Sequence, residues 1–150
     1  MGEQMNIDQI TEGYLCALQW ADCEEGTNPR ISNQARKAAR AECELFTTHC
    51  GILADRAIEL IGAHRFGFLF RLNSGGHGSG FWDEKALKEP SSDTSIMGIN
   101  REGKAYKPRT GSLGNQLSDI AYGGSHISRH CFKEAEQSRG WVYIMGVTNV

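Results

Sequence analysis

Residues 75–83, GGHGSGFWD, place one imidazole and one carboxylate among four glycines. Histidine exchanges protons near neutral pH, so His77 and Asp83 are the candidate acid/base pair of a small enzyme or ligand-binding protein. The sequence places no nucleophile beside them, and a histidine in a glycine-rich turn commonly forms local hydrogen bonds. We therefore lean toward a non-enzymatic protein without catalytic residues, and keep His77 and Asp83 as the alternative.

Two further patterns could bind a phosphate or a metal. Consecutive glycine amides can hold an anion, but a nucleotide-binding loop runs into a helix, and here an aromatic segment follows the glycines. His126 and His130, with Cys131 beside them, would share a face on a helix and could then hold a metal. The alternation in residues 125–132 favours a strand instead, on which the two imidazoles lie about 13 Å apart. We predict no metal and no cofactor.

Charge along the chain restricts its partners. With 16 basic and 18 acidic residues, the net charge is −2, so we expect no direct binding to nucleic acid or to a membrane. No apolar run reaches the roughly 18 residues that span a bilayer, and no secretory signal follows the start, which predicts a cytoplasmic protein. Five cysteines without a CxxC pair predict reduced thiols. Two charged segments are either solvated loops or partner contacts: acidic Asp22, Glu24 and Glu25, and basic Arg101, Lys104, Lys107 and Arg109.

Helical periodicity dominates the first 60 residues. Apolar residues at steps of three and four predict a helix over residues 6–22, in which Gly13 is a weak point. A longer seam predicts a second helix from residue 31 to about 61, with a bend or break at Gly51 and an end at Gly62. The first stripe is Ile7, Ile10, Tyr14 and Leu18, and the seam is Ala35, Ala39, Cys43, Phe46, Cys50, Leu53, Ala57 and Leu60.

The period changes after the second helix. Alternating phenylalanines predict a strand over residues 65–72, and GFWDE predicts a return strand, with a glycine turn at 75–78 between them. In this hairpin Phe81 and Trp82 point to opposite faces. We expect the three tryptophans and six phenylalanines to pack in the core rather than to stack on nucleic-acid bases.

The second half of the chain begins with a long polar segment, residues 85–112, which is either mobile or functional and could contain a small hairpin. Residues 112–124 predict a short helix with Ser112 as its N-cap. Two strands, 125–132 and 141–147, would form a second hairpin around KEAEQSRG.

These elements predict a single domain, residues 1–150, with an α+β fold. Two N-terminal helices and a short third helix would pack on an antiparallel sheet of about four strands. The sequence does not determine the oligomeric state, because the long seam could also pair between two chains and form a homodimer.

One block, residues 62–84, reads GAHRFGFLFRLNSGGHGSGFWDE, and three other segments accompany it: YLCALQWADCEEGTNP, ARAECELF and GNQLSDIAYG. Together they resemble a family of small uncharacterised tailed-phage proteins over most of the chain. The chain departs from that family in the strand FGFLFRL and in an apparent insertion over residues 85–111. The family's motif falls on His64, His77, Gly78, Gly80, Phe81, Trp82 and Asp83.

The resemblance implies a phage or prophage origin and no known enzyme activity. We expect an accessory protein that acts in the host cytoplasm and inhibits a host protein or complex, for example a component of a CRISPR-type defence system. The predicted contacts are the two charged groups above, together with His64, His77, Trp82 and Asp83. The alternative is a small enzyme or ligand binder that uses the 75–83 hairpin.

Overall fold

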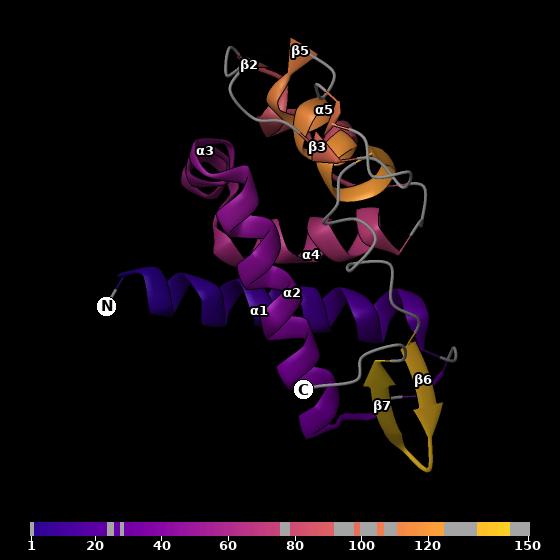
Figure 1. The fold of residues 1–150 in the computed structure, drawn as a ribbon. Helices are drawn as coiled ribbons and strands as arrows, with labels where there is room; N and C mark the ends of the chain where they lie inside the picture. Colours follow the sequence, from indigo (N-terminus) through magenta and orange to yellow (C-terminus); the bar gives the residue numbers. More distant parts are fainter. Residues whose placement is uncertain are drawn as a thin grey trace.

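The computed structural model describes residues 2–23, 26–27, 29–75, 79–91, 98–99, 105–106, 111–124 and 135–144. Helices form most of this part of the chain: α1 (Gly2–Asp22), α2 (Asn33–Cys50), α3 (Ile52–Ile61), α4 (Ala63–Ser74) and α5 (Leu113–Ser118). Three single turns of other helix types accompany them: η1 (Phe81–Asp83), η2 (Lys85–Leu87) and the π-helical η3 (Asp119–Gly124). In Figure 1, α1 and α4 lie side by side, α2 runs across α1, and α5 lies on the far side of α4.

The strands are short. They are β1 (Arg30–Ile31), β2 (Pro90–Ser91), β3 (Gly98–Ile99), β4 (Ala105–Tyr106), β5 (Gly111–Ser112), β6 (Ala135–Ser138) and β7 (Trp141–Ile144). Three of them form a mixed sheet in the order β1-β7-β6, with β1 parallel and β6 antiparallel to β7. The others form two antiparallel pairs, β2 with β5 and β3 with β4. The three-stranded sheet packs against α2, at the opposite end of the molecule from α5 (Figure 1).

The contact between α1 and α4 depends on two glycines. A Cβ atom at Gly13 would lie 1.9 Å from the carbonyl oxygen of His64, and one at Gly67 would lie 1.8 Å from that of Ile10. No side chain larger than hydrogen fits at either position unless the helices separate. The low helix propensity of Gly13 is therefore offset by the close packing that it permits.

The long apolar seam is divided between two helices. The hydroxyl oxygen of Ser32 caps α2 by accepting a hydrogen bond of 3.0 Å from the backbone N–H of Ala35. The helix ends at Gly51, whose φ of 54° is unfavourable for other residues, and α3 follows directly and ends at Gly62. The seam is buried from Ala35 to Ala57, so both the seam and the break at Gly51 are confirmed.

Four phenylalanines form the centre of the core. Phe46 of α2 stacks on Phe70 of α4, with ring centroids 4.0 Å apart and planes 1° from parallel. Phe66 and Phe81 complete the group, with centroid separations of 5.2 to 5.9 Å. All four side chains are fully buried, as expected from their type.

The tryptophans, in contrast, are not core residues. Trp20, Trp82 and Trp141 expose 73%, 43% and 39% of their surface, so the prediction that they pack in the core is wrong. Trp20 lies two residues beyond the buried Leu18 on α1, and a two-residue step turns about 200° around a helix. The periodicity that placed Leu18 inside therefore places Trp20 outside.

The predicted aromatic hairpin is also wrong. Residues 65–72 belong to α4, and the segment after Gly80 forms the 3₁₀ turn η1 instead of a return strand. Phe66 and Phe70 are four residues apart, so they share the buried face of a helix just as they would share one face of a strand. Phe68, which lies between them in the sequence, is directed to another side of the helix and is half-buried. Phe81 is fully buried and Trp82 is 43% exposed, but they lie in a 3₁₀ turn and not on opposite faces of a strand.

The observed fold is broadly α+β, but helices dominate it. The sheet has three strands and is mixed, so the predicted antiparallel sheet of about four strands is wrong. Strand β7 and the helix that Ser112 caps are confirmed, and β3 with β4 is the small hairpin expected inside 85–112. Within the predicted loop KEAEQSRG, residues 135–138 form strand β6, so that loop is wrong. The observed hairpin turns at Arg139–Gly140, both at positive φ, and residues 125–132 lie outside the described part.

Candidate functional site

The segment from Ser79 to Asp83 is a compact turn that uses its own polar groups. The carboxylate of Asp83 accepts hydrogen bonds from the Ser79 hydroxyl, at 3.1 Å, and from the backbone N–H of Gly80, also at 3.1 Å. Asp83 therefore caps η1, in the manner of acidic residues in a first helical turn. His77, its predicted partner, lies outside the described residues.

Two buried side chains hold this turn against the helices. The side-chain oxygen of Asn73 in α4 accepts from the backbone N–H of Phe81 at 2.8 Å and from the Ser118 hydroxyl at 3.0 Å. The Ser118 oxygen in turn accepts from the backbone N–H of Trp82 at 2.8 Å. A Cβ atom at Gly80 would lie 2.2 Å from the Asn73 side chain, so the glycine is required for this close approach. The turn is thus fixed by α4 on one side and α5 on the other.

An exposed aromatic patch lies beside this turn, formed by Trp20 of α1 and by Phe68 and Arg65 of α4. The Trp20 and Phe68 rings have centroids 5.8 Å apart, and the Arg65 guanidinium lies 5.4 Å from the Phe68 centroid. Arg65 also donates to the carboxylate of Glu84 at 3.1 Å, which links the patch to the residues that follow Asp83. His64, the residue before Arg65, is exposed in the first turn of α4.

Asp22 has a structural partner. Its carboxylate accepts a hydrogen bond of 2.9 Å from the guanidinium of Arg71, which is only 2% exposed, and Asp22 itself is 14% exposed. Arg71 also donates to the Tyr14 hydroxyl at 3.1 Å. Burial acts to lower the pKa of Arg71, but Tyr14 and Asp22 outweigh it and raise that pKa, so Arg71 is a fixed buried cation.

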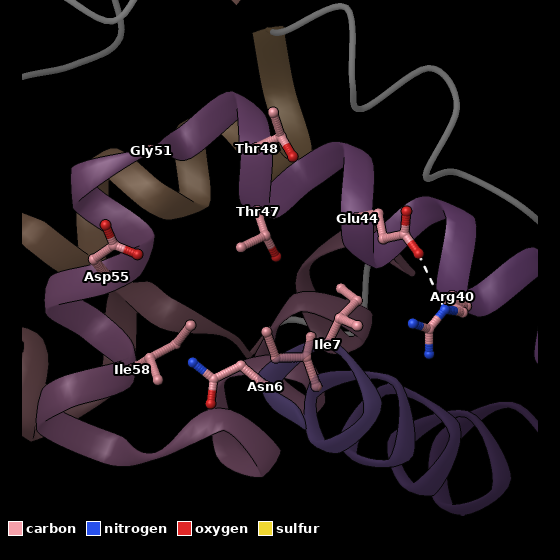
Figure 2. Close-up of a pocket in the computed structure, with 10 residues that line it drawn as sticks. Asn6, Ile7, Arg40, Glu44, Thr47, Thr48, Gly51, Asp55 and Ile58 are labelled. Carbon is pink, nitrogen blue, oxygen red and sulfur yellow. Dashed lines mark hydrogen bonds and ion pairs between the residues drawn. The ribbon is translucent and has the colours of Figure 1, made fainter. Parts of the chain in front are cut away.

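A groove of about 660 Å³ lies between α1, α2 and α3, at the opposite end of α1 from Trp20. Figure 2 shows Ile7 and Ile58 on one side and residues of α2 on the other. Its lining comprises Asn6, Ile7, Ile10, Arg40, Glu44, Thr47, Thr48, Gly51, Asp55 and Ile58.

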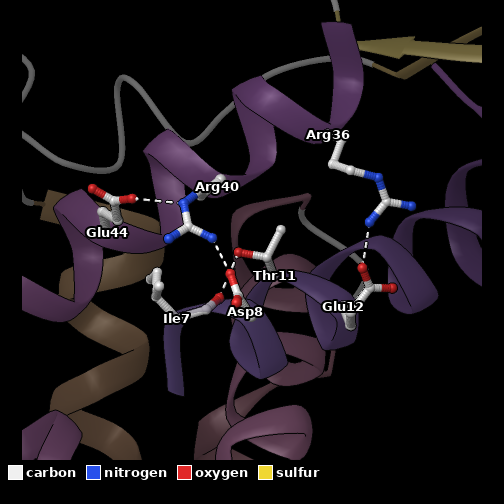
Figure 3. Close-up of polar contacts among 7 residues, drawn as sticks. All are labelled: Ile7, Asp8, Thr11, Glu12, Arg36, Arg40 and Glu44. Atoms are coloured by element: carbon white, nitrogen blue, oxygen red, sulfur yellow. Dashed lines mark hydrogen bonds and ion pairs between the residues drawn. The ribbon is translucent and has the colours of Figure 1, made fainter. Parts of the chain in front are cut away.

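Ion pairs between α1 and α2 form one rim of this groove (Figure 3). Arg40 contacts two carboxylates, Asp8 of α1 and Glu44 of α2, and its pKa is raised chiefly by the hydrogen bond to Asp8. Arg36 pairs with Glu12 one turn further along. These pairs are exposed, so each contributes little to stability but helps to fix the position of the charges.

Several predicted site residues fall outside the described part of the chain, namely Glu24, Glu25, His77, Arg101, Lys104, Lys107 and Arg109. The same holds for His126, His130 and Cys131. Within the described ranges, no three His, Cys, Asp or Glu side chains lie close enough together to hold a metal ion. Over those ranges, no helix has the length and apolar character required to cross a membrane.

Comparison of the chain with protein-family models, with curated proteins and with solved structures gave no match. The resemblance to phage proteins therefore stays a prediction. Of the predicted contacts, His64 and Asp83 are each adjacent in sequence to one member of the Arg65–Glu84 ion pair, and Trp82 lies in the same turn as Asp83.

Sequence reasoning missed three features: the Arg71–Tyr14–Asp22 contact, the aromatic patch and the groove. The groove had a sequence signal, because Arg40, Glu44, Thr47, Gly51, Asp55 and Ile58 recur at steps of three and four beside the buried seam. The aromatic patch also had a sequence signal, because Trp20 does not follow the spacing of the buried apolar residues of α1. The ion pair of Arg71 had no local signal, since its partner is 49 residues away.

Proposed function

We propose that this chain is an accessory protein of a phage or prophage, which binds a host protein and inhibits it without catalysing a reaction. The first partner to test is a component of a CRISPR-type defence system. The resemblance of the 62–84 block to phage proteins supports the proposed origin. A surface suited to contact with another protein supports the proposed mode of action.

The aromatic patch is the observation that carries this proposal. Trp20 is 73% exposed and its ring packs against Phe68, and the Arg65 guanidinium lies near that same Phe68 ring. Tryptophan, phenylalanine and arginine are enriched at protein interfaces, and tryptophan and arginine are enriched among the residues that dominate binding free energy. An ordered, exposed tryptophan loses little further freedom on binding, which favours affinity.

The predicted contacts extend this surface. Trp82 is 43% exposed in η1, and its backbone is held by Ser118 and by the Lys88 ammonium, which donates to the Trp82 carbonyl at 2.7 Å. The Arg65–Glu84 bond joins η1 to the patch. The proposed contact surface therefore extends from the Trp20–Phe68 pair, through Arg65 and Glu84, to η1.

The enzymatic alternative loses its framework. It used a hairpin over residues 75–83, but the strand expected before that turn is helix α4, and Phe81–Asp83 form the 3₁₀ turn η1. Asp83, its proposed acid or base, is used to cap the turn. We do not carry this pair forward as a catalytic site.

A capture experiment tests the proposal. Tagged wild-type protein and the variants Trp20→Ala and Trp141→Ala are expressed in a bacterial host that carries an active defence system, and bound proteins are identified at stoichiometric yield. We expect wild type and Trp141→Ala to retain one partner, and Trp20→Ala to lose it at least about tenfold, as for a central interface tryptophan. Trp141 is the matched control because it is an exposed tryptophan of β7, on a different element from Trp20 and Phe68.

Phage infection supplies the functional readout. Expression of the wild-type protein should raise plaque numbers in the defended host and leave them unchanged in an otherwise identical host without the defence system. Absence of a stoichiometric partner, combined with plaque numbers in the defended host that are the same with and without expression of the protein, would contradict the proposal. Equal capture by Trp20→Ala and wild type would show that the patch is not the contact.

A further inference from the structure

The groove between α1, α2 and α3 has the size and lining of a small-molecule site. Its volume of about 660 Å³ falls within the usual range for such sites, which is about 300 to 1,000 Å³. Three isoleucines supply its apolar wall, Ile7 and Ile10 from α1 and Ile58 from α3. Figure 2 shows Ile7 and Ile58 facing the space below α2.

The charges at the groove favour a cation. Three carboxylates, Asp8, Glu44 and Asp55, lie at or beside it, against one guanidinium, Arg40. Arg40 is already shared between Asp8 and Glu44 (Figure 3). Asp55 forms no ion pair with any residue that the structure describes, so its charge is available to a ligand. An anionic ligand would meet an excess of negative charge here.

A hydrogen-bonding group without a partner lies on the same wall. The Thr47 hydroxyl oxygen is shielded from solvent and has no hydrogen-bond partner among the described residues. Figure 2 shows Thr47 directed from α2 into the groove. Because this oxygen has no exposed surface, a ligand in the groove contacts the remainder of the Thr47 side chain and not its hydroxyl.

The break at Gly51 aligns these groups. The backbone N–H of Gly51 donates to the Thr47 carbonyl at 3.1 Å, and that of Asp55 donates to the Gly51 carbonyl at 3.2 Å. The four-residue spacing thus continues across the break, which places Thr47 and Asp55 on the same side of the α2–α3 pair. Acidic residues are common in the first turn of a helix, so Asp55 alone does not indicate a binding site. Its position opposite the isoleucine wall of the groove is what indicates one.

We propose that this groove binds a small amphipathic primary amine. Its apolar body packs against Ile7, Ile10 and Ile58, and its ammonium group donates to the carboxylate of Asp55. The site lies at the opposite end of α1 from the aromatic patch and does not depend on the function proposed above. The ligand class follows from the combination of an isoleucine wall with an unpaired carboxylate.

A matched pair of probes tests the charge preference without any change to the protein. Hexylammonium and hexanoate have the same apolar length and opposite charges, and each is titrated into the full chain while amide chemical shifts are followed by NMR. We expect hexylammonium to shift residues 6–10, 47–48 and 51–58, and to bind at least about fivefold more tightly than hexanoate. Equal affinity for both probes, or shifts located elsewhere, would overturn the proposal.

Two isosteric variants test the position of the ammonium. Asp55→Asn should weaken hexylammonium binding about fivefold, because it removes the charge and keeps the shape. Glu59→Gln is the matched control, because Glu59 lies one turn further along α3, outside the groove, and pairs with Arg56. It should change affinity by less than about twofold. Circular dichroism confirms that both variants remain folded, and equal binding by Asp55→Asn and wild type would overturn the assignment.

Two further results would exclude the proposed ligand. Spermidine that binds as tightly as hexylammonium would show attraction of any cation to an acidic surface, with no role for the isoleucines. Concentration-dependent dimerisation that abolishes hexylammonium binding would show that the groove is an interface between two copies of the chain. Light scattering over the concentration range of the titration distinguishes that case.

Discussion

At the scale of single residues, the chain uses its polar groups to fix its own structure more than the sequence suggested. Asp22, expected in an acidic contact patch, neutralises the buried Arg71. Asp83, expected as an acid or base, caps a turn. Asn73 and Ser118 hold the backbone of Phe81 and Trp82. The predicted contact segment therefore presents Trp82 to solvent from a rigid support.

The Asp22–Arg71 contact should be the most sensitive ion pair among the described residues, because the other pairs are exposed. Asp22→Ala leaves the Arg71 charge buried, with Tyr14 as its remaining hydrogen-bond partner in the described part of the chain, so we expect a loss of about 3 kcal/mol in the free energy of unfolding. Asp55→Asn, at an exposed position without an ion pair among those residues, should cost less than about 1 kcal/mol. Urea denaturation measures both, and equal losses would contradict the structural role of Asp22.

At the scale of elements, the packing of α1 on α4 is fixed by glycine rather than by large side chains. Gly13 and Gly67 each face a backbone carbonyl of the other helix at a distance that excludes a Cβ atom. The contact brings Trp20 beside Phe68 and Tyr14 beside Phe70, so both the aromatic patch and part of the core depend on it.

Gly13→Ala and Gly67→Ala should therefore destabilise the protein even though alanine is the better helix former. Propensity alone predicts a gain of about 1 kcal/mol, whereas forcing the helices apart should cost about 1 to 3 kcal/mol, which leaves a net loss or no gain. Lys37→Ala, on the exposed face of α2, should change stability by less than about 0.5 kcal/mol. Thermal unfolding by circular dichroism compares the three, and clear stabilisation by either glycine variant would contradict the close contact.

The elements also show what the sequence could and could not predict. Periodicity located α1, the seam of α2 and α3 and the break at Gly51, because each of these depends on neighbours three or four residues away. It failed at residues 65–72, because the alternation of Phe66, Phe68 and Phe70 fits a strand while the spacing of Phe66 and Phe70 also fits a helix. The site residues that were missed pair across tens of residues, as Arg71 does with Asp22, and no local pattern records such a pairing.

At the scale of the whole molecule, the buried apolar side chains of the described residues form one cluster. Cys43 and Cys50 lie inside it and are fully buried, whereas Cys16 is exposed on α1. Desolvation by burial raises the pKa of both buried thiols above the ordinary value of about 8.5. Because the thiolate is the reactive form, these two cysteines should react only when the core opens.

A pH series tests this arrangement. A thiol with a raised pKa in the folded state contributes stability that is present below the unfolded pKa, so stability should fall as pH rises above about 8.5. Replacing Cys43 and Cys50 with alanine should flatten that fall, while Cys16→Ala should not. Iodoacetamide labelling at pH 8, read by mass spectrometry, should modify Cys16 in minutes and Cys43 and Cys50 at the rate of unfolding. Equal labelling of all three would contradict the buried positions.

The pairing of β1 with β7 has a consequence for how the chain is made. Arg30 aligns with Trp141, and the Gln34 side chain bonds both the N–H and the carbonyl of Ile144. At about 5 to 20 residues per second, a ribosome needs roughly 5 to 20 seconds between synthesis of the two segments. During that interval β1 and the start of α2 lack their contacts with β7. A helical nucleus built from α1 to α4 can form first, and the sheet can form only after residues 135–144 have been synthesised.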